Sequence, residues 1–307
     1  MRGKYSFWTK VLSCLIAGLA VTSFLIPDAG RGEVWLFGHS GLLSGVCGVL
    51  SIVAIVVSLM AINTKSVNNV FNPSLTTIFF LLVVLLNPSA VYFSPMHPAV
   101  LLFVWGQFCF ITDRKFISMF LLSLSALIWP PLVWTLPLVL VISIFGAADI
   151  SRVTVKSLGG LVIPFLYMLC YRFMVANDVT VFIDGYVHSA MQFSTSLKSI
   201  EISSLFMVAC VVWISLHALS YMFARLYNNS IITEHILKME FMCLMLGSAV
   251  FALFWGNGSQ PVNMVVALPL AMILSHYFTA NINTAAARIE LILLCCAVLI
   301  SRLSYFI

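Results

Sequence analysis

The chain has 307 residues, of which 62% are hydrophobic and 8% are charged. An ordinary soluble domain is about 45–50% apolar and about 25% charged, so the composition excludes a soluble enzyme, a disordered chain and a coiled coil. The Lys and Arg residues behind the net charge of +5 are scattered along the chain, whereas a nucleic-acid surface needs a clustered basic patch. The apolar residues form blocks and do not alternate, which excludes an outer-membrane barrel.

A helix needs about 20 apolar residues to cross the hydrocarbon core of a bilayer. The blocks therefore predict an all-α, polytopic transmembrane helix bundle of 10–11 spans. No linker, low-complexity run or internal repeat divides the chain, so we expect a single integral membrane domain over residues 1–307. The expected spans are residues 8–26, 41–63, 74–93, 98–112, 116–129, 132–147, 158–176, 202–222, 241–256, 261–280 and 289–306.

The basic residues indicate the orientation of the spans. With a cytoplasmic N-terminus, eleven Lys and Arg residues face the cytoplasm and four face outward, which is the asymmetry of the positive-inside rule. We therefore expect the N-terminus to be cytoplasmic. The eleven are Arg2, Lys4, Lys10, Lys65, Arg114, Lys115, Arg152, Lys156, Arg225, Lys238 and Arg288, and the four are Arg31, Arg172, Lys198 and Arg302.

The start of the chain admits two interpretations, a cleaved signal peptide or a retained first helix. A basic start and an apolar stretch fit both. The stretch of residues 11–26 is longer than the core of a typical signal peptide, and no clean A-x-A site follows it. A retained helix is therefore favoured.

The first expected outer loop, residues 27–33, holds two carboxylates, Asp28 and Glu33, on either side of Arg31. A carboxylate in this place can act as a general base toward a hydroxyl group, and arginine binds phosphate bidentately. Asp28 and Glu33 are therefore the candidate catalytic residues, and Arg31 is a candidate substrate-binding residue. A solvated turn rich in Gly and Asp is the alternative interpretation.

Two prolines, Pro130 and Pro131, interrupt residues 116–147 directly after Trp129. Proline lacks a backbone donor and disfavours the α region for the residue before it, so a turn is expected here. Arg114 and Lys115 lie before the segment, and Arg152 and Lys156 lie after it. Both groups favour the cytoplasm, so the chain must cross outward and return. We therefore predict a hairpin of two short helices, and whether these cross the membrane fully stays open.

Residues 180–199 have the pattern of an amphipathic helix lying on the outer membrane surface. Polar Asp184, His188 and Gln192 recur at steps of four, which places them on one side. The apolar positions are Phe182, Ile183, Tyr186, Val187, Ala190, Phe193 and Leu197. The polar side either lines a site or only caps the bundle.

Two other outer residues are candidates for substrate binding. Arg172 near the end of its span either binds an anionic group or extends to the lipid phosphates. His97 lies between two prolines and is expected in a loop. His217 and His276 lie within spans and are expected to hydrogen-bond to neighbouring helices. Glu240 is expected in a solvated inner loop.

No cofactor or metal site is expected. All eight cysteines fall in apolar segments, without a CxxC motif or a Cys/His pair at the spacing of metal ligands. Asp184 and His188 have ligand spacing, but two ligands without a third do not make a zinc site. The cysteines are therefore expected to pack as small apolar side chains.

The Pro and Gly pattern in the second two-thirds of the chain resembles that of a family of multispanning inner-membrane proteins from Bacteroidota, which implies a bacterial inner (cytoplasmic) membrane location. The layout is more distantly similar to polytopic C-type glycosyltransferases, in which polyprenyl-phosphate sugars are donors and a carboxylate in the first outer loop is catalytic. Only Asp28 and Glu33 match that position. The stretches that carry the first resemblance are Phe116–Phe120, Ile128–Pro131, Gly159–Pro164 and Ala267–Ala271, followed by Arg288 and Glu290.

The leading hypothesis is an envelope-glycan enzyme, or its inactive relative, that acts on a polyprenyl-phosphate-linked sugar at the outer face of the inner membrane. In it, Arg31 and Arg172 hold the phosphate, and Asp184 and His188 contact sugar hydroxyls. The alternatives are a non-catalytic scaffold or assembly subunit and a lipid or small-solute transporter. No carboxylate or lysine is expected at mid-membrane, which argues against an ion-coupled transporter. Membrane lipid is the expected partner, and nucleic acid is not.

Overall fold

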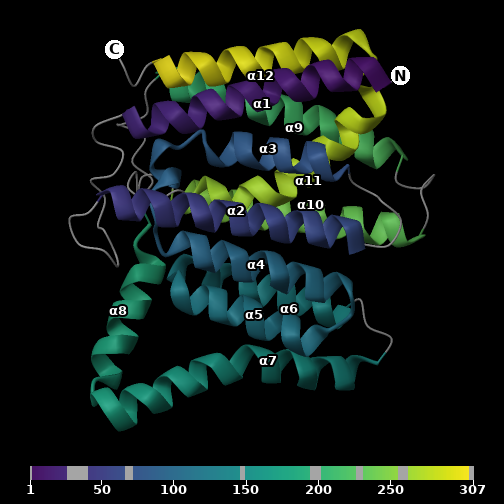
Figure 1. Cartoon of the computed structure of the whole chain (residues 1–307). Coiled ribbons are helices and arrows are strands. Elements are labelled where there is room, and N and C mark those ends of the chain that lie inside the picture. The colour runs from purple at the N-terminus through teal and green to yellow at the C-terminus, as the bar shows by residue number, and fades with distance from the viewer. Residues whose placement is uncertain are drawn as a thin grey trace. The chain divides into compact units, whose positions relative to one another are not determined.

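The computed structural model describes residues 2–25, 41–65, 72–145, 149–193, 202–225, 231–254 and 262–303. Within them the secondary structure is helical, without a strand (Figure 1). The elements are α1 (Arg2–Leu25), α2 (Gly41–Lys65), α3 (Pro73–Val84), η1 (Pro88–Val91), α4 (Met96–Ile111), α5 (Lys115–Ile128), η2 (Pro130–Thr135), α6 (Leu136–Phe145), α7 (Ile150–Tyr171), η3 (Arg172–Ala176), α8 (Val179–Met191), α9 (Ile202–Arg225), α10 (Ile231–Phe254), α11 (Asn263–Asn281) and α12 (Ala285–Leu303).

Six stretches of helix in the described parts are long and apolar enough to cross a membrane, which confirms the all-α polytopic membrane fold. Shorter apolar helices, among them α3, α4 and α5, accompany them. The number of spans and the cytoplasmic N-terminus stay predictions. The six stretches are Phe7–Phe24, Leu43–Ile62, Ile150–Ala176, Leu205–Ala224, Ile236–Phe254 and Asn263–Asn281.

The chain divides into two compact units, which are described separately. Unit 1 comprises residues 1–94, 196–248 and 256–307, and unit 2 comprises residues 95–195 and 249–255. The expectation of one integral membrane domain stays a prediction.

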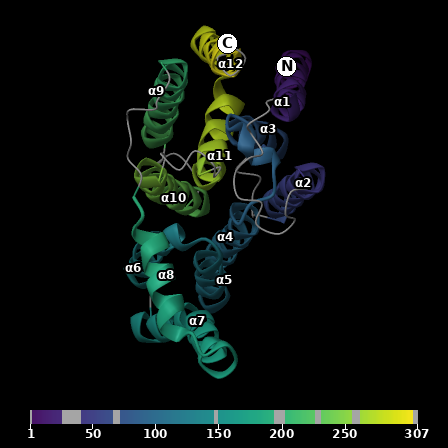
Figure 2. The ribbon, with the colours of Figure 1, turned by 90° about the vertical axis from the view of Figure 1, so that its left-hand side faces the viewer.

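The interior of unit 1 is built on α3 and α11, which pack along each other (Figure 2). The side-chain amide of Asn263 donates to the carbonyl oxygens of Val83 and Val84, at 2.5 and 3.0 Å. These carbonyls belong to the last turn of α3, where helix geometry leaves acceptors without a partner. The rings of Phe79 and Phe278 stack at 5.2 Å between the two helices. Polar and aromatic contacts together therefore hold α11 against α3.

In unit 2, α5 packs against both α4 and α7 through small residues. The hydroxyl groups of Ser118 and Ser125 donate to the carbonyl oxygens of Gly106 and Ala99 on α4, at 2.8 and 2.7 Å. On the α7 side, Gly160 faces the backbone of α5, without space for a side chain. Small residues that allow close approach of backbones are typical of helix contacts in membranes.

The break at Trp129, Pro130 and Pro131 lies where the sequence predicts it. Helix α5 ends at Ile128, the prolines open the 3-10 turn η2, and α6 runs back toward the end at which α5 began (Figure 1). The 14 residues of α5 and the 10 residues of α6 reach about 21 and 15 Å, and the hydrocarbon core is about 30 Å thick. Each helix by itself is therefore shorter than a full span.

Candidate functional site on helix α8

Helix α7 ends in a π-helical turn that leads into α8. The Arg172 guanidinium at this corner forms an ion pair with the Asp178 carboxylate, with 2.9 Å between Nη1 and Oδ2. It also lies over the Phe182 ring at 5.2 Å. Between them, Asn177 adopts a left-handed conformation with φ of 50°, which asparagine tolerates better than most residues. Arg172 thus joins α7 to α8, and its predicted contact with an anionic group stays a proposal.

The apolar side of α8 is held against the end of the hairpin. The Tyr186 hydroxyl donates to the carbonyl oxygen of Ala126 on α5 at 3.0 Å, and the Trp134 indole of η2 donates to the carbonyl oxygen of Ala190 at 2.9 Å. The Tyr186 ring also makes an edge contact with Phe165 of α7. Burial raises the pKa of the Tyr186 phenol. Helix α8 is thereby attached to three neighbouring elements.

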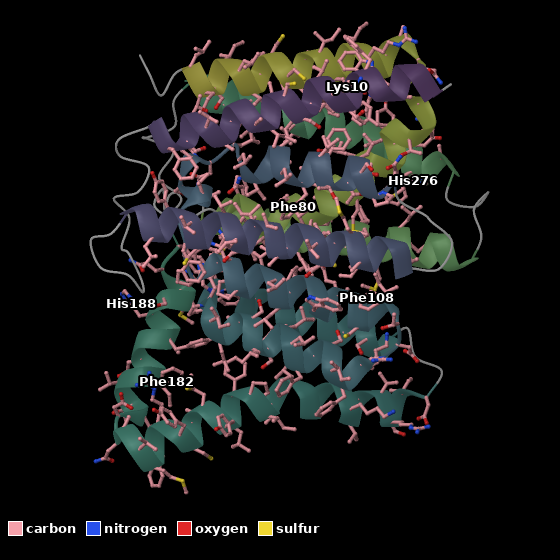
Figure 3. The ribbon with its side chains drawn as sticks, viewed as in Figure 1. Lys10, Phe80, Phe108, Phe182, His188 and His276 are labelled. Carbon is pink, nitrogen blue, oxygen red and sulfur yellow. The ribbon has the colours of Figure 1, made fainter. Side chains whose placement is uncertain are left out.

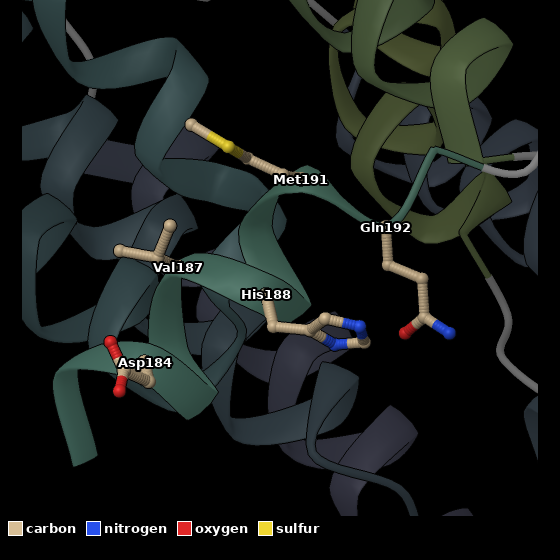
Figure 4. Close-up of a pocket in the computed structure, with 5 residues that line it drawn as sticks. All are labelled: Asp184, Val187, His188, Met191 and Gln192. Atoms are coloured by element: carbon tan, nitrogen blue, oxygen red, sulfur yellow. The ribbon is translucent and has the colours of Figure 1, made fainter. Parts of the chain in front are cut away.

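The opposite side of α8 carries the polar stripe. Asp184, His188 and Gln192 are exposed and line an open hollow of about 380 Å³ together with Val187 and Met191. Figure 4 shows the His188 imidazole beside the Gln192 amide, with Asp184 one turn earlier on the helix. Figure 3 labels His188 on α8, at the left-hand side of the view. A carboxylate, an imidazole and an amide can accept or donate hydrogen bonds to hydroxyl groups, and Val187 and Met191 add an apolar border.

The other predicted site residues have different positions. Asp28, Arg31 and Glu33 lie outside the described residues. His97 belongs to the first turn of α4 and is fully buried, so the expected loop position is wrong. Pro98 is compatible with this turn because the first backbone N–H groups of a helix have no intrahelical acceptor. Burial separates His97 from the exposed stripe on α8.

Two carboxylates in unit 1 are buried, and one of them, Glu240, differs from the sequence interpretation. Glu240 was expected in a solvated loop, but it lies within α10 and only 1% of it is exposed. Glu290 lies within α12, 6% exposed, with Oε1 2.5 Å from Nδ1 of His217. His217 therefore bonds to a neighbouring helix, as predicted. The sequence contains a pattern that indicates burial of Glu240. It lies three or four residues from Leu237, Cys243 and Leu244, which places it on the same side of a helix as these buried residues.

No group of three or more His, Cys, Asp or Glu residues within the described segments is arranged to hold a metal ion. Asp184 and His188 thus have no third ligand of these types among the residues that the structure describes.

The fold and these sites define a multi-pass α-helical membrane protein that carries an amphipathic helix with an open polar side. A comparison with protein-family models finds no family that matches the chain. Comparisons with curated proteins and with solved structures find no match either.

Proposed function

We propose that the protein binds a polyprenyl-phosphate-linked sugar at the outer face of the bacterial inner membrane and acts in envelope-glycan transfer. The observation that supports this best is the open polar stripe of α8. Helix α8 is held through its apolar side, while Asp184, His188 and Gln192 remain exposed. A helix attached in this way presents its polar groups in a defined orientation.

The chemistry of α8 and its surroundings suits an amphiphilic ligand of this class. The three polar side chains would hydrogen-bond to sugar hydroxyls. The lipid chain would lie against the exposed apolar residues of α7 and η3, among them Tyr167, Phe173 and Met174. The Arg172 side chain is one-third exposed beside α8. An arginine donor in this position would contact the phosphate.

In the proposed reaction, Asp28 or Glu33 removes the proton from the acceptor hydroxyl. The acceptor oxygen then forms a bond with the anomeric carbon of the sugar, and the bond from that carbon to the phosphate oxygen breaks. Polyprenyl phosphate leaves, and Arg31 and Arg172 stabilise its negative charge. Asp184 and His188 orient the sugar.

The test is a mass-spectrometric profile of polyprenyl-linked glycans in a strain that lacks the gene. The gene is returned as wild type, as Asp28→Asn with Glu33→Gln, and as Asp184→Asn with His188→Gln. Ser189→Ala is the matched control, because Ser189 is an exposed polar residue of α8 outside the hollow. Membrane levels of each variant are measured in parallel.

We expect a lipid-linked precursor to accumulate in the deletion strain and in both double variants, and to be cleared by wild type and by Ser189→Ala. An unchanged profile in the deletion strain would reject glycan transfer. Clearance by both double variants, with a partner that copurifies, would favour a non-catalytic assembly subunit. Substrate flux in liposomes without a change in glycans would favour a transporter.

A further inference from the structure

An ionisable pair lies inside unit 1, away from the α8 site. His217 of α9 and Glu290 of α12 are 73 residues apart in sequence, yet Nδ1 and Oε1 approach to 2.5 Å. Glu290 is five residues from the start of α12, which is about 7.5 Å along the helix axis. The carboxylate side chain is 7% exposed and the imidazole side chain is 49% exposed.

A buried carboxylate in a membrane-spanning bundle is unstable without a positive charge or a bound proton. The approach of Nδ1 to Oε1 requires a hydrogen between these two atoms. Two arrangements meet this requirement, an imidazolium with a carboxylate or a neutral imidazole with a carboxylic acid. In the carboxylic-acid form, either carboxyl oxygen of Glu290 can carry the proton.

The described groups near the pair include aromatic side chains and the cation Arg288. The Tyr277 phenol of α11 interacts with the Glu290 carboxylate. Tyr221 on α9 makes ring contacts with both His276 and Tyr277. Arg288 lies two residues before Glu290, but its guanidinium donates to the carbonyl oxygen of Asn283 at 2.9 Å. Trp213, one turn before His217, contacts the imidazole ring at 5.4 Å.

We infer that His217 and Glu290 form a proton-binding site in unit 1, between the candidate membrane span Leu205–Ala224 and α12. The imidazole is the more exposed member of the pair and receives the incoming proton, and the buried carboxylate holds it. The transfer begins with a neutral His217, protonated on Nδ1, and an ionised Glu290. A proton binds at Nε2, and the proton on Nδ1 then passes to Oε1, which leaves a neutral imidazole and a carboxylic acid. This site is independent of the proposed sugar site.

Infrared difference spectroscopy of the purified full-length protein in lipid nanodiscs tests the inference. The spectrum in alkaline buffer is subtracted from the spectrum in acidic buffer. Repeating the measurement in D₂O distinguishes carboxylic-acid bands from imidazole bands. The variants are Glu290→Gln, Glu290→Asp and His217→Gln. Arg288→Gln is the control on the same helix, because Arg288 donates to the carbonyl oxygen of Asn283 and is partly exposed. Glu240→Gln identifies bands of the second buried carboxyl group. Size-exclusion profiles and circular dichroism verify folding.

We expect acidification of the wild type to produce a carboxylic-acid band that Glu290→Gln removes and Glu290→Asp displaces. His217→Gln is expected to displace the same band and to remove imidazole bands, and Arg288→Gln to leave all of them in place. An identical difference spectrum for wild type and Glu290→Gln would overturn the inference. The inference would also be overturned if the carboxylic-acid band had the same position in Glu290→Asp as in the wild type. This second variant keeps the inference testable if Glu290→Gln does not fold.

Discussion

The Trp134 indole N–H donates a hydrogen bond to the carbonyl oxygen of Ala190 at 2.9 Å, which attaches the turn η2 to helix α8. Trp134 is in this position because Pro130 and Pro131 end the helical run and open the 3-10 turn. The proline pair thus has two structural consequences. It makes the hairpin of α5 and α6, and it places the donor that helps to hold the candidate site.

Trp134→Phe should lower the free energy of unfolding by about 1 kcal/mol, because the ring is largely kept while the donor to Ala190 is lost. Thermal unfolding in detergent, followed by maleimide labelling of buried cysteines such as Cys109, measures the change. Trp8→Phe is the control, since the described contact of Trp8 is a ring contact with Phe7. Equal melting temperatures for Trp134→Phe and wild type would contradict a role of this bond in holding α8.

Gly160→Ala should destabilise the packing of α7 on α5 by about 1–3 kcal/mol. An added Cβ would overlap the carbonyl oxygen of Phe116 and lie 3.1 Å from the Cβ of Met119. Gly159 is the matched control, because a Cβ there would make an ordinary contact of 3.6 Å with the Phe116 ring. Gly159→Ala should be neutral or slightly stabilising, since alanine favours helix over glycine. The same thermal assay compares the two variants, and equal losses would show that the contact is not as close as described.

Tyr186 should make part of the stability depend on alkaline pH. Burial raises the pKa of the folded-state phenol above its unfolded value, so its contribution is complete below about pH 10 and decreases as pH rises further. Apparent melting temperatures between neutral pH and pH 11 should therefore fall more steeply for wild type than for Tyr186→Phe. Parallel curves would indicate that the Tyr186 phenol ionises as freely in the folded protein as in the unfolded chain.

Arg302→Lys should destabilise unit 1 by about 2 kcal/mol, because an ammonium cannot reproduce the fork of guanidinium donors. Arg302 lies in α12, and its bonds reach Thr22 Oγ1 at 3.1 Å, the Leu19 carbonyl oxygen at 2.8 Å and the Leu85 carbonyl oxygen at 3.3 Å, with a further bond to the Ser23 hydroxyl. These bonds connect α1 and the end of α3 to α12. Arg288→Lys is the control, since Arg288 donates to an exposed carbonyl of its own helix end. A melting temperature unaffected by Arg302→Lys would exclude this connecting role.

The sequence predicts the parts of α8 and the hairpin that depend on local rules. Helical periodicity places Asp184 and His188 on one side of α8, and the described structure has both exposed. The helix predicted for residues 180–199 ends at Met191, so Gln192 lies just beyond it. Two consecutive prolines predict the turn after Trp129 because they remove backbone donors and restrict the preceding residue. Both predictions need only the geometry of a few neighbouring residues.

The predictions for Glu240 and His97 were wrong because they used only the types of the neighbouring residues. Polar neighbours favoured a solvated loop for Glu240, but continued helical periodicity buries its side chain in α10. His97 was expected in a loop because two prolines flank it, yet the first turn of a helix accommodates both. In each case the position of a residue within its helix decided the outcome.

The sequence by itself determined that this is a multi-pass α-helical membrane protein, because span length and hydropathy follow from the thickness of the bilayer. It also determined the break at the proline pair and the polar side of α8. Only the tertiary structure decided that His217 meets Glu290, that Arg172 pairs with Asp178 and that Trp134 reaches Ala190. These contacts depend on how each helix is rotated and placed against its neighbours, and that arrangement results from packing across the whole unit.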